Sequence, residues 1–297
     1  MFKGIGILEF QKKFFDNDSC FEYLVDYKWS NGFKCRRCGF TESLKGKTRF
    51  HKRCKECKYD ESVTANTLFH DTKMPILKAF HMLFRLSAKK KGMSTTELAS
   101  EVGVEQKTAW LFKRKVQVAM KQEEKLNGKV DVDETVLGFH TDRAHCGRNL
   151  EIRKALMIGA EILPDGRTGN IRLQDIKDFK ADTLQSAIEN MVKPAASLRS
   201  DEYKSYKTLQ IRGMNIKLEN SEKGQAFLEI HRQIMQFKNW LIGIHHKWSR
   251  QHLHAYADEY VFRFNRRNCR GRIFHSLIER MMGALPHPYP KLKSLCA

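Results

Sequence analysis

The stretch VDVDETVLGF, residues 130–139, combines the pattern of a β-strand with an unusual concentration of acid. Its valines favour a strand, and the side chains of a strand alternate between the two faces of a sheet. Asp131 and Asp133 therefore share one face, whereas Val130 and Val132 share the other. Because the chain as a whole carries a formal charge of +20, these acids stand in a basic background. Such a strand either displays its acids to solvent or uses them to bind a cation.

A second acidic strand end occurs further along the chain. Residues 154–162 and 169–179 read as the next two strands, joined by the turn LPDGR, and residues 181–192 read as a helix. The segment 197–206 then reads as a short strand that runs into Asp201. If the first and fourth strands lie side by side, aspartates distant in sequence meet and can bind a divalent metal. The alternative is that these acids are ordinary surface residues.

The composition indicates a polyanionic partner. Lysine and arginine outnumber aspartate and glutamate by 54 to 34, which favours binding to nucleic acid. The N-terminus has no apolar core of signal-peptide length, and no run of about 18 apolar residues occurs. We therefore expect a cytoplasmic protein that associates with the nucleoid.

Two Cys-x-x-Cys pairs predict a metal site near the N-terminus. Cys35 and Cys38 are followed after fifteen residues by Cys54 and Cys57. This spacing can present four thiolates to one Zn²⁺, and four thiolates leave no open position for a substrate. The alternatives are unrelated thiols or a redox pair. The sequence thus predicts a structural zinc that holds a small ribbon together.

A helix-turn-helix pattern follows in the segment MSTTELASEVGVEQKTAWLFKRKV, residues 93–116. Ser94 with Glu97 resembles a capping box, and Gly103 stands where the turn between two helices is needed. The second helix of such a motif brings its first residues to the DNA base edges. The residues expected to contact DNA here are Gln106, Lys107, Thr108, Lys113 and Arg114. An ordinary helical hairpin is the alternative.

Five segments, in order, resemble one known family. They are CFEYLVDYKWSNGFKCRRCGF, the helical segment that ends in STTELASEVGVEQKTAW, VDVDETVLGF, SDEYKSY and HHKWSRQHLHAYADEYVFRFNRRN. Together they resemble the zinc-ribbon insertion-sequence transposases whose catalytic part is called the ISXO2-like transposase domain. The resemblance covers nearly the whole chain.

This resemblance implies an α+β multidomain protein. Residues 1–60 would form the zinc ribbon, residues 61–125 the helix-turn-helix region, and residues 126–297 a ribonuclease-H-like α/β catalytic domain. It implies a DDE-type enzyme that uses Mg²⁺ or Mn²⁺ to cut DNA strands and join them to a target. Its partners would be double-stranded DNA, at terminal inverted repeats and target, and a second copy or larger assembly of itself.

The resemblance also suggests catalytic residues. The first family aspartate falls on Asp133 and the second on Asp201, both as Mg²⁺ ligands, while Asp131 is a neighbour. At the third position the family has glutamate with a histidine, or asparagine followed closely by lysine. This chain has Gln236 and Lys238 there, so we expect Gln236 to supply an amide oxygen and Lys238 a catalytic or phosphate-binding ammonium.

Two alternatives stay open. Glu229 lies seven residues before Gln236 and could be the third ligand, because residues seven apart share a helix face. The protein could also be a transposase-derived DNA-binding protein without chemistry, or a ribonuclease-H-like nuclease for RNA or branched DNA. In each case, a cluster of arginines near the C-terminus suits contact with phosphates. These residues are Arg263, Arg266 and Arg267.

Overall fold

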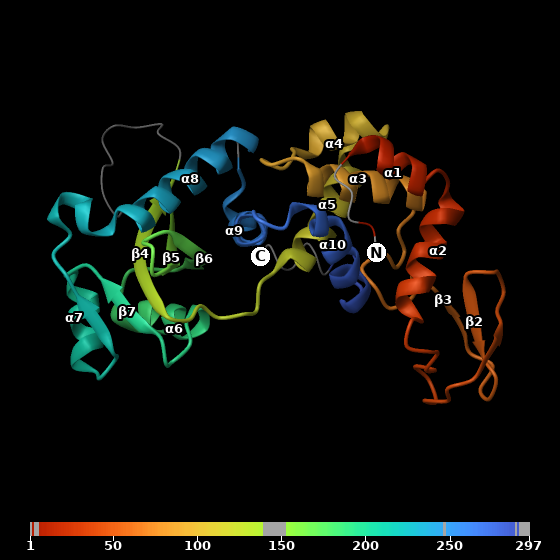
Figure 1. The fold of residues 1–297 in the computed structure, drawn as a ribbon, viewed down its shortest axis with the longest axis horizontal. Coiled ribbons are helices and arrows are strands. Elements are labelled where there is room, and N and C mark those ends of the chain that lie inside the picture. Colours follow the sequence, from red (N-terminus) through yellow and green to blue (C-terminus); the bar gives the residue numbers. More distant parts are fainter. Residues whose placement is uncertain (1, 3–5, 139–152, 246–247, 289, 291–297) are drawn as a thin grey trace. The chain divides into compact units, whose positions relative to one another are not determined.

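The computed structural model describes residues 2, 6–138, 153–245, 248–288 and 290. The chain divides into two compact units, one made of Met1–Met120 with Cys269–Ala297 and the other of Lys121–Asn268 (Figure 1). The expected zinc ribbon (1–60) and helix-turn-helix region (61–125) fall almost entirely in the first unit, and the segment from Cys269 belongs to that unit as well. Among the described residues, no helix has the length and apolar character that crossing a membrane requires.

The first unit contains a small antiparallel sheet and a set of helices. Its elements are α1 (Ile7–Lys13), α2 (Asn17–Lys28), β1 (Ser43–Lys45), β2 (His51–Cys54), β3 (Asp60–Ser62), α3 (Ile76–Ala88), α4 (Thr95–Val102), α5 (Gln106–Met120), η3 (Arg270–Arg272) and α10 (Ile273–Gly283). The sheet order is β1-β2-β3, and both pairings are antiparallel. The three strands are short, so the ribbon buries little apolar surface of its own.

A cluster of phenylalanines explains why α10 belongs to the first unit. Phe10 of α1 stacks on Phe84 of α3 with ring centroids 4.4 Å apart. Phe274 of α10 packs against Phe10 at 5.7 Å and against Phe80 at 5.8 Å. Aromatic side chains bury large areas and favour such tilted and edge-on contacts. The buried apolar face of α3 therefore packs partly against α10.

The second unit is built around a five-stranded sheet. Its elements are β4 (Lys129–Leu137), β5 (Lys154–Ile162), β6 (Thr168–Ile176), α6 (Ala181–Met191), β7 (Ser197–Ser200), α7 (Lys204–Ile211), β8 (Ile216–Leu218), η1 (Glu222–Phe227), α8 (Leu228–Ile244), η2 (Arg250–His252) and α9 (Leu253–Asn265). The strand order is β6-β5-β4-β7-β8. Strands β4, β5 and β6 run antiparallel, whereas β4, β7 and β8 run parallel. The first and fourth strands, β4 and β7, are thus neighbours, which is the condition under which their acids can meet.

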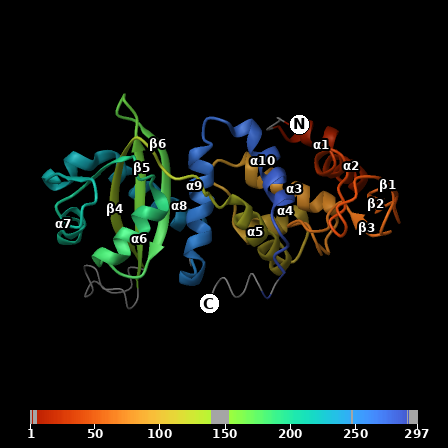
Figure 2. The same ribbon diagram turned by 90° about the horizontal axis from the view of Figure 1, so that it is seen from below.

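Helices cover both faces of this sheet. Along β5, Ala155 and Met157 join a buried cluster with α6 and α7, whereas Leu156 and Ile158 join another with α8 and α9. The alternation follows from the two-residue period of a strand. Helices α6 and α8 therefore lie on opposite faces of the sheet (Figure 2). The face that carries Asp133 and Leu137 is the one that α8 covers.

Candidate zinc centre and candidate catalytic site

The four predicted cysteines converge in the first unit. The Sγ atoms of Cys35 and Cys57 lie 3.6 Å apart, those of Cys38 and Cys54 lie 3.5 Å apart, and all four lie within 4.8 Å of one another. A tetrahedral Zn²⁺ with Zn–S bonds of about 2.3 Å separates its sulfurs by about 3.8 Å. The cluster fits a closed, structural zinc site.

The two cysteine pairs are held by matching backbone turns. The fourth residue after the first cysteine of each pair has left-handed backbone, with φ of 79° at Gly39 and 59° at Lys58. The N–H of Gly39 donates to the carbonyl of Cys35 at 2.8 Å, and that of Lys58 to the carbonyl of Cys54 at 3.2 Å. Glycine adopts this conformation freely, whereas Lys58 adopts it at a steric cost. The repeated turn aims both pairs of sulfurs at one point.

The two acidic strand ends meet in the second unit. Strands β4 and β7 pair in parallel, with Asp131 opposite Arg199. Continuing this register by two residues places Asp133 beside Asp201, which directly follows β7. Neighbouring strands lie about 4.8 Å apart. The backbone N–H of Glu134 donates to Asp133 at 2.7 Å, and that of Tyr203 donates to Asp201 at 3.1 Å, so a following N–H orients each carboxylate.

The acids of β4 differ in their surroundings. Asp131 is 1% exposed and accepts two hydrogen bonds from the Arg199 guanidinium, at 2.6 and 2.8 Å. Glu134 is also buried, and its carboxylate accepts a 2.6 Å hydrogen bond from the Tyr206 hydroxyl. Burial and the neighbouring Glu134 raise the pKa of Tyr206 well above its usual value, so this hydroxyl keeps its proton. The side chain of Asp133, by contrast, is 21% exposed. Solvent and substrate can thus reach Asp133.

Helix α8 brings two basic side chains to Asp133. The Nε2 atom of His231 lies 3.3 Å from Oδ2 of Asp133. Burial lowers the pKa of Lys238, and the negative charge of Asp133 acts in the opposite direction. His231 and Lys238 are seven residues apart, which places them on one face of the helix. An imidazole and an ammonium therefore stand on the helix face turned toward the acids.

The expected third ligands lie elsewhere on α8. Gln236 is exposed and precedes Lys238 by two residues, which is more than half a turn around the helix. Glu229 accepts a 2.9 Å hydrogen bond from Thr168 and pairs with Arg232. Sequence reasoning missed His231 as the α8 residue that contacts Asp133. Its seven-residue spacing from Lys238 was the available signal.

The acid pair alone does not form a closed metal site. Within the described ranges, the cysteine cluster is the single group of three or more His, Cys, Asp or Glu side chains that is arranged to hold a metal ion. Mg²⁺ commonly binds to one or two carboxylates and keeps water or substrate phosphate as its other ligands. Asp133 and Asp201 fit that kind of open site.

The predicted DNA contacts on α5 separate into two groups. Gln106 and Lys107 are exposed at the start of the helix, and Thr108 is half-buried. Lys113 and Arg114 are buried, contrary to expectation. The ammonium of Lys113 donates to a backbone carbonyl at 2.7 Å, and the Arg114 guanidinium donates to a glutamine side chain at 2.9 Å. They lie on a part of α5 that packs into the first unit, so only the start of the helix presents polar groups to solvent.

Two of the three C-terminal arginines bind acceptors within the second unit. Arg263 forms a 3.0 Å ion pair with Glu259, which is completely buried. Arg267 donates hydrogen bonds to the carbonyls of Thr168 and Gly169 at 2.6 and 3.1 Å. These guanidiniums are directed at protein acceptors. Arg263 and Arg267 thus have acceptors within the protein, and their expected contact with DNA stays a prediction.

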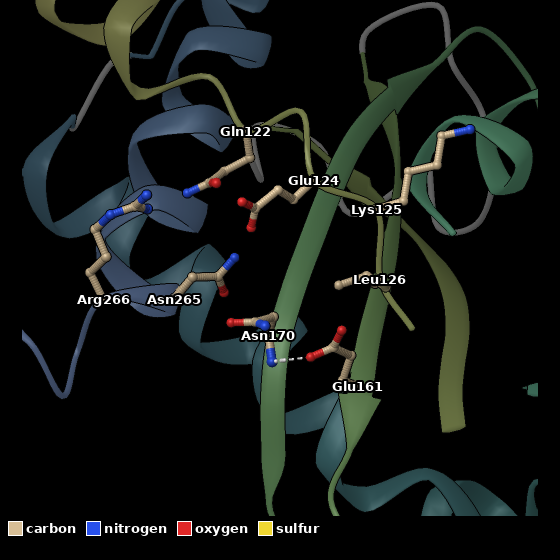
Figure 3. Close-up of a pocket in the computed structure, with 8 residues that line it drawn as sticks. All are labelled: Gln122, Glu124, Lys125, Leu126, Glu161, Asn170, Asn265 and Arg266. Carbon is tan, nitrogen blue, oxygen red and sulfur yellow. Dashed lines mark hydrogen bonds between the residues drawn. The ribbon is translucent and has the colours of Figure 1, made fainter. Parts of the chain in front are cut away.

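The guanidinium of Arg266 lies over the ring of Phe262, 4.1 Å from its centroid. Arg266 also lines a polar pocket of about 200 Å³, whose residues are drawn in Figure 3. The lining residues are Gln122, Glu124, Lys125, Leu126, Glu161, Asn170, Asn265 and Arg266. Asn265 both donates to and accepts from the backbone of Ile171. Glu161 accepts backbone N–H groups of Asn127 and Asn170 at 3.0 Å. Glu161 on β5 thus binds both the segment before β4 and strand β6, and Asn265 binds β6 as well.

Two family models match the chain, one in each unit. Residues 16–60 match the model of the transposase zinc-ribbon domain, and residues 125–265 match that of the ISXO2-like transposase domain. The chain is thus a transposase by its domains. It belongs to the zinc-ribbon transposases that carry an ISXO2-like transposase domain.

Other comparisons are more distant. No curated protein matches the chain. One similar solved structure is the cryo-electron-microscopy structure of a simian T-cell lymphotropic virus intasome in complex with PP2A regulatory subunit B56 gamma. The identity is 12% and the TM-score 0.28, and the match covers 58% of this chain and 61% of that chain.

Proposed function

We propose that this transposase is a DDE-type enzyme with a ribonuclease-H-like catalytic unit, which cuts and joins DNA strands at the ends of an insertion sequence. One observation carries the proposal. The pairing of β4 with β7 sets Asp131 opposite Arg199, and the same register continued by two residues sets Asp133 beside Asp201, which follows β7. Two carboxylates placed in this way suit phosphodiester chemistry that depends on a divalent metal.

The residues around this pair have separable roles in the proposal. Asp133 and Asp201 would hold Mg²⁺ or Mn²⁺, which when bound activates a water or a DNA 3′-hydroxyl and stabilises charge on the leaving oxygen. His231 is placed beside Asp133 to donate a hydrogen bond or to serve as a further ligand. Lys238 would neutralise a phosphate oxygen. Gln236 is exposed on another face of α8 and has no part in this arrangement.

The first unit would supply recognition of the terminal inverted repeats. Helix α4 ends at Gly103, whose φ of 64° makes the turn into α5. The exposed Gln106 and Lys107, with Thr108 beside them, then begin α5 in the position that a helix-turn-helix uses to read base edges. The zinc ribbon would add contacts to the DNA backbone. Because two element ends must be held together, the active form would be a dimer or larger assembly.

A strand-cleavage assay tests this function. The substrate is duplex DNA taken from the sequence that flanks the gene, incubated with Mn²⁺ and the full-length protein. Wild type should release a strand with a 3′-hydroxyl end, and Asp133→Asn should reduce cutting by at least about a hundredfold. Glu202→Gln, which removes the exposed acid next to Asp201, is the matched control and should cut normally.

A DNA-binding protein without catalytic activity is the second candidate. It is favoured because, among the described residues, Asp133 and Asp201 are not part of a group of three or more metal-ligating side chains. It predicts that wild type and Asp133→Asn retain DNA equally in a gel-shift assay while neither cuts. Equal cutting by wild type and Asp133→Asn would contradict the assignment of the catalytic site.

A further inference from the structure

A buried hydrogen bond joins the two chain segments that carry the candidate metal ligands. The hydroxyl of Tyr206 on α7 donates to the carboxylate of Glu134 on β4 at 2.6 Å, across 72 residues of sequence. Both side chains are buried. Glu134 directly follows Asp133, and Tyr206 comes five residues after Asp201. Each partner of the bond is thus close in sequence to one of the two acids.

Backbone pairing between β4 and β7 stops short of the acids. The last pair of this register in the described part of the chain is Asp131 with Arg199. Asp133 lies two residues beyond that pair, and Asp201 lies beyond the end of β7. The ladder of β4 and β7 therefore brings the two acids near each other, and a contact further along the chain is needed to set their separation.

Strand β4 is the fixed side of this arrangement. Its antiparallel pairing with β5 extends over residues 130–137, which include Asp133 and Glu134. Asp201, by contrast, lies in the link between β7 and α7. Tyr206 is the third residue of α7, so its hydrogen bond to Glu134 ties the start of this helix to β4. The link that carries Asp201 is thereby held at both of its ends.

The hydrogen bond and the acid of β4 lie on opposite faces of the sheet. Successive side chains of a strand alternate between faces. Val132, two residues before Glu134, shares a buried cluster with Tyr206 and α6, whereas Asp133 contacts His231 of α8 on the other face. A hydrogen bond in such a buried place is electrostatically stronger than one in water. The bond can therefore hold the link in place without occupying space at the site.

We propose that the hydrogen bond between Tyr206 and Glu134 positions Asp201 relative to Asp133 for binding a divalent metal. This inference rests on the proposed function, since it concerns the same metal site. Because both side chains are buried, they act through the acids beside them in the chain and not on the substrate. Groups that hold metal ligands in place change metal affinity by about 10–100-fold when they are removed.

Binding of Mn²⁺ in the absence of DNA tests this role without requiring catalysis. Full-length, zinc-loaded protein is titrated with Mn²⁺, the free ion is measured by electron paramagnetic resonance, and Asp133→Asn identifies the binding that belongs to the site. Tyr206→Phe removes one hydroxyl and changes no charge, so it should weaken this binding about tenfold. Tyr260→Phe makes the same change at a buried tyrosine of α9 and should leave the affinity unchanged.

Two substitutions of Glu134 separate the hydrogen bond from the charge. Glu134→Gln keeps an oxygen that can accept from the Tyr206 hydroxyl, whereas Glu134→Leu offers no acceptor. Both remove the same negative charge, so Glu134→Gln should bind Mn²⁺ about tenfold more tightly than Glu134→Leu. This comparison decides the matter even if Tyr206→Phe does not fold. Circular dichroism sets a temperature at which the compared variants are folded.

The outcomes separate this inference from the proposed function. If folded Tyr206→Phe binds Mn²⁺ as tightly as wild type, or if the two Glu134 variants bind it equally, the positioning role is overturned while DNA cutting by wild type still supports the enzyme. A protein whose Mn²⁺ affinity depends on Tyr206 but which cuts no DNA keeps the positioning role and loses the enzyme. If Asp133→Asn removes no Mn²⁺ binding, the metal site and the positioning role are both refuted.

Discussion

Two aspartates on one face of β4 are expected to respond in opposite ways to the same substitution. Asp131→Asn removes a carboxylate that is 1% exposed and paired at two positions with Arg199. Asp133→Asn removes one that is 21% exposed at the candidate catalytic site. Each change replaces one oxygen by an amide nitrogen and alters no volume, so the pair isolates the effect of charge.

The expected loss of stability follows from the surroundings of Arg199. Breaking a buried ion pair costs about 3–5 kcal/mol when the remaining charge is fully buried. The Arg199 side chain is 19% exposed and keeps a 3.0 Å ion pair with Glu219, so we expect Asp131→Asn to cost about 2–3 kcal/mol. For a unit of this size each kcal/mol lowers the melting temperature by about 2–4 °C, which gives a decrease of about 4–12 °C. Asp133→Asn should change stability by less than about 0.5 kcal/mol.

Urea unfolding of both variants, followed by tryptophan fluorescence, measures these values, and the cleavage assay is run on the same preparations at a temperature where both remain folded. We expect Asp131→Asn to be unstable and Asp133→Asn to be stable and inactive. If Asp133→Asn lost as much stability as Asp131→Asn, or if Asp131→Asn were as stable as wild type, the division of roles between the two acids would be refuted.

Two further predictions concern the zinc site and the half-buried Asp258. Cys57→Ser should unfold the ribbon, since its buried cluster holds only Phe33, Cys35 and Cys54 among the described residues, and hydrogen exchange should then rise in β1–β3 but not in β4–β6. Burial raises the pKa of Asp258 to about 6, against the attraction of Lys121 and Arg172, while Asp175 raises it further. As the pH rises from 4 to 6, the Asp258 carboxyl therefore ionises first in the unfolded chain. The free energy of unfolding then falls by up to about 3 kcal/mol. Asp258→Asn should raise the urea midpoint most above pH 6 and progressively less toward pH 4; an equal gain at both ends would contradict this.

Much of the local structure was predictable because it depends on neighbouring residues. The strand expected at 154–162 is β5 with the same bounds, since its apolar run is buried on both faces. The turn at Gly103 and the Ser94 cap form as expected, the cap accepting the N–H of Glu97 at 3.1 Å. Cysteine spacing likewise predicted the cluster, because four thiolates at that spacing reach one point.

The sequence by itself determined the cysteine cluster and the strand pattern, which follow from spacing and the two-residue period of a strand. The pairing of β4 with β7, which brings the two acidic strand ends together, belongs to the tertiary structure. Only the tertiary structure decided which side chains are available for function. It buried Lys113, paired Arg263 with Glu259 and placed Gln236 on another face of α8 from Lys238, because the contacts of a helical side chain depend on which face of the helix meets the core. It also placed His231 beside Asp133, because the rotation of α8 over the sheet is set by the packing of both faces and not by any local pattern.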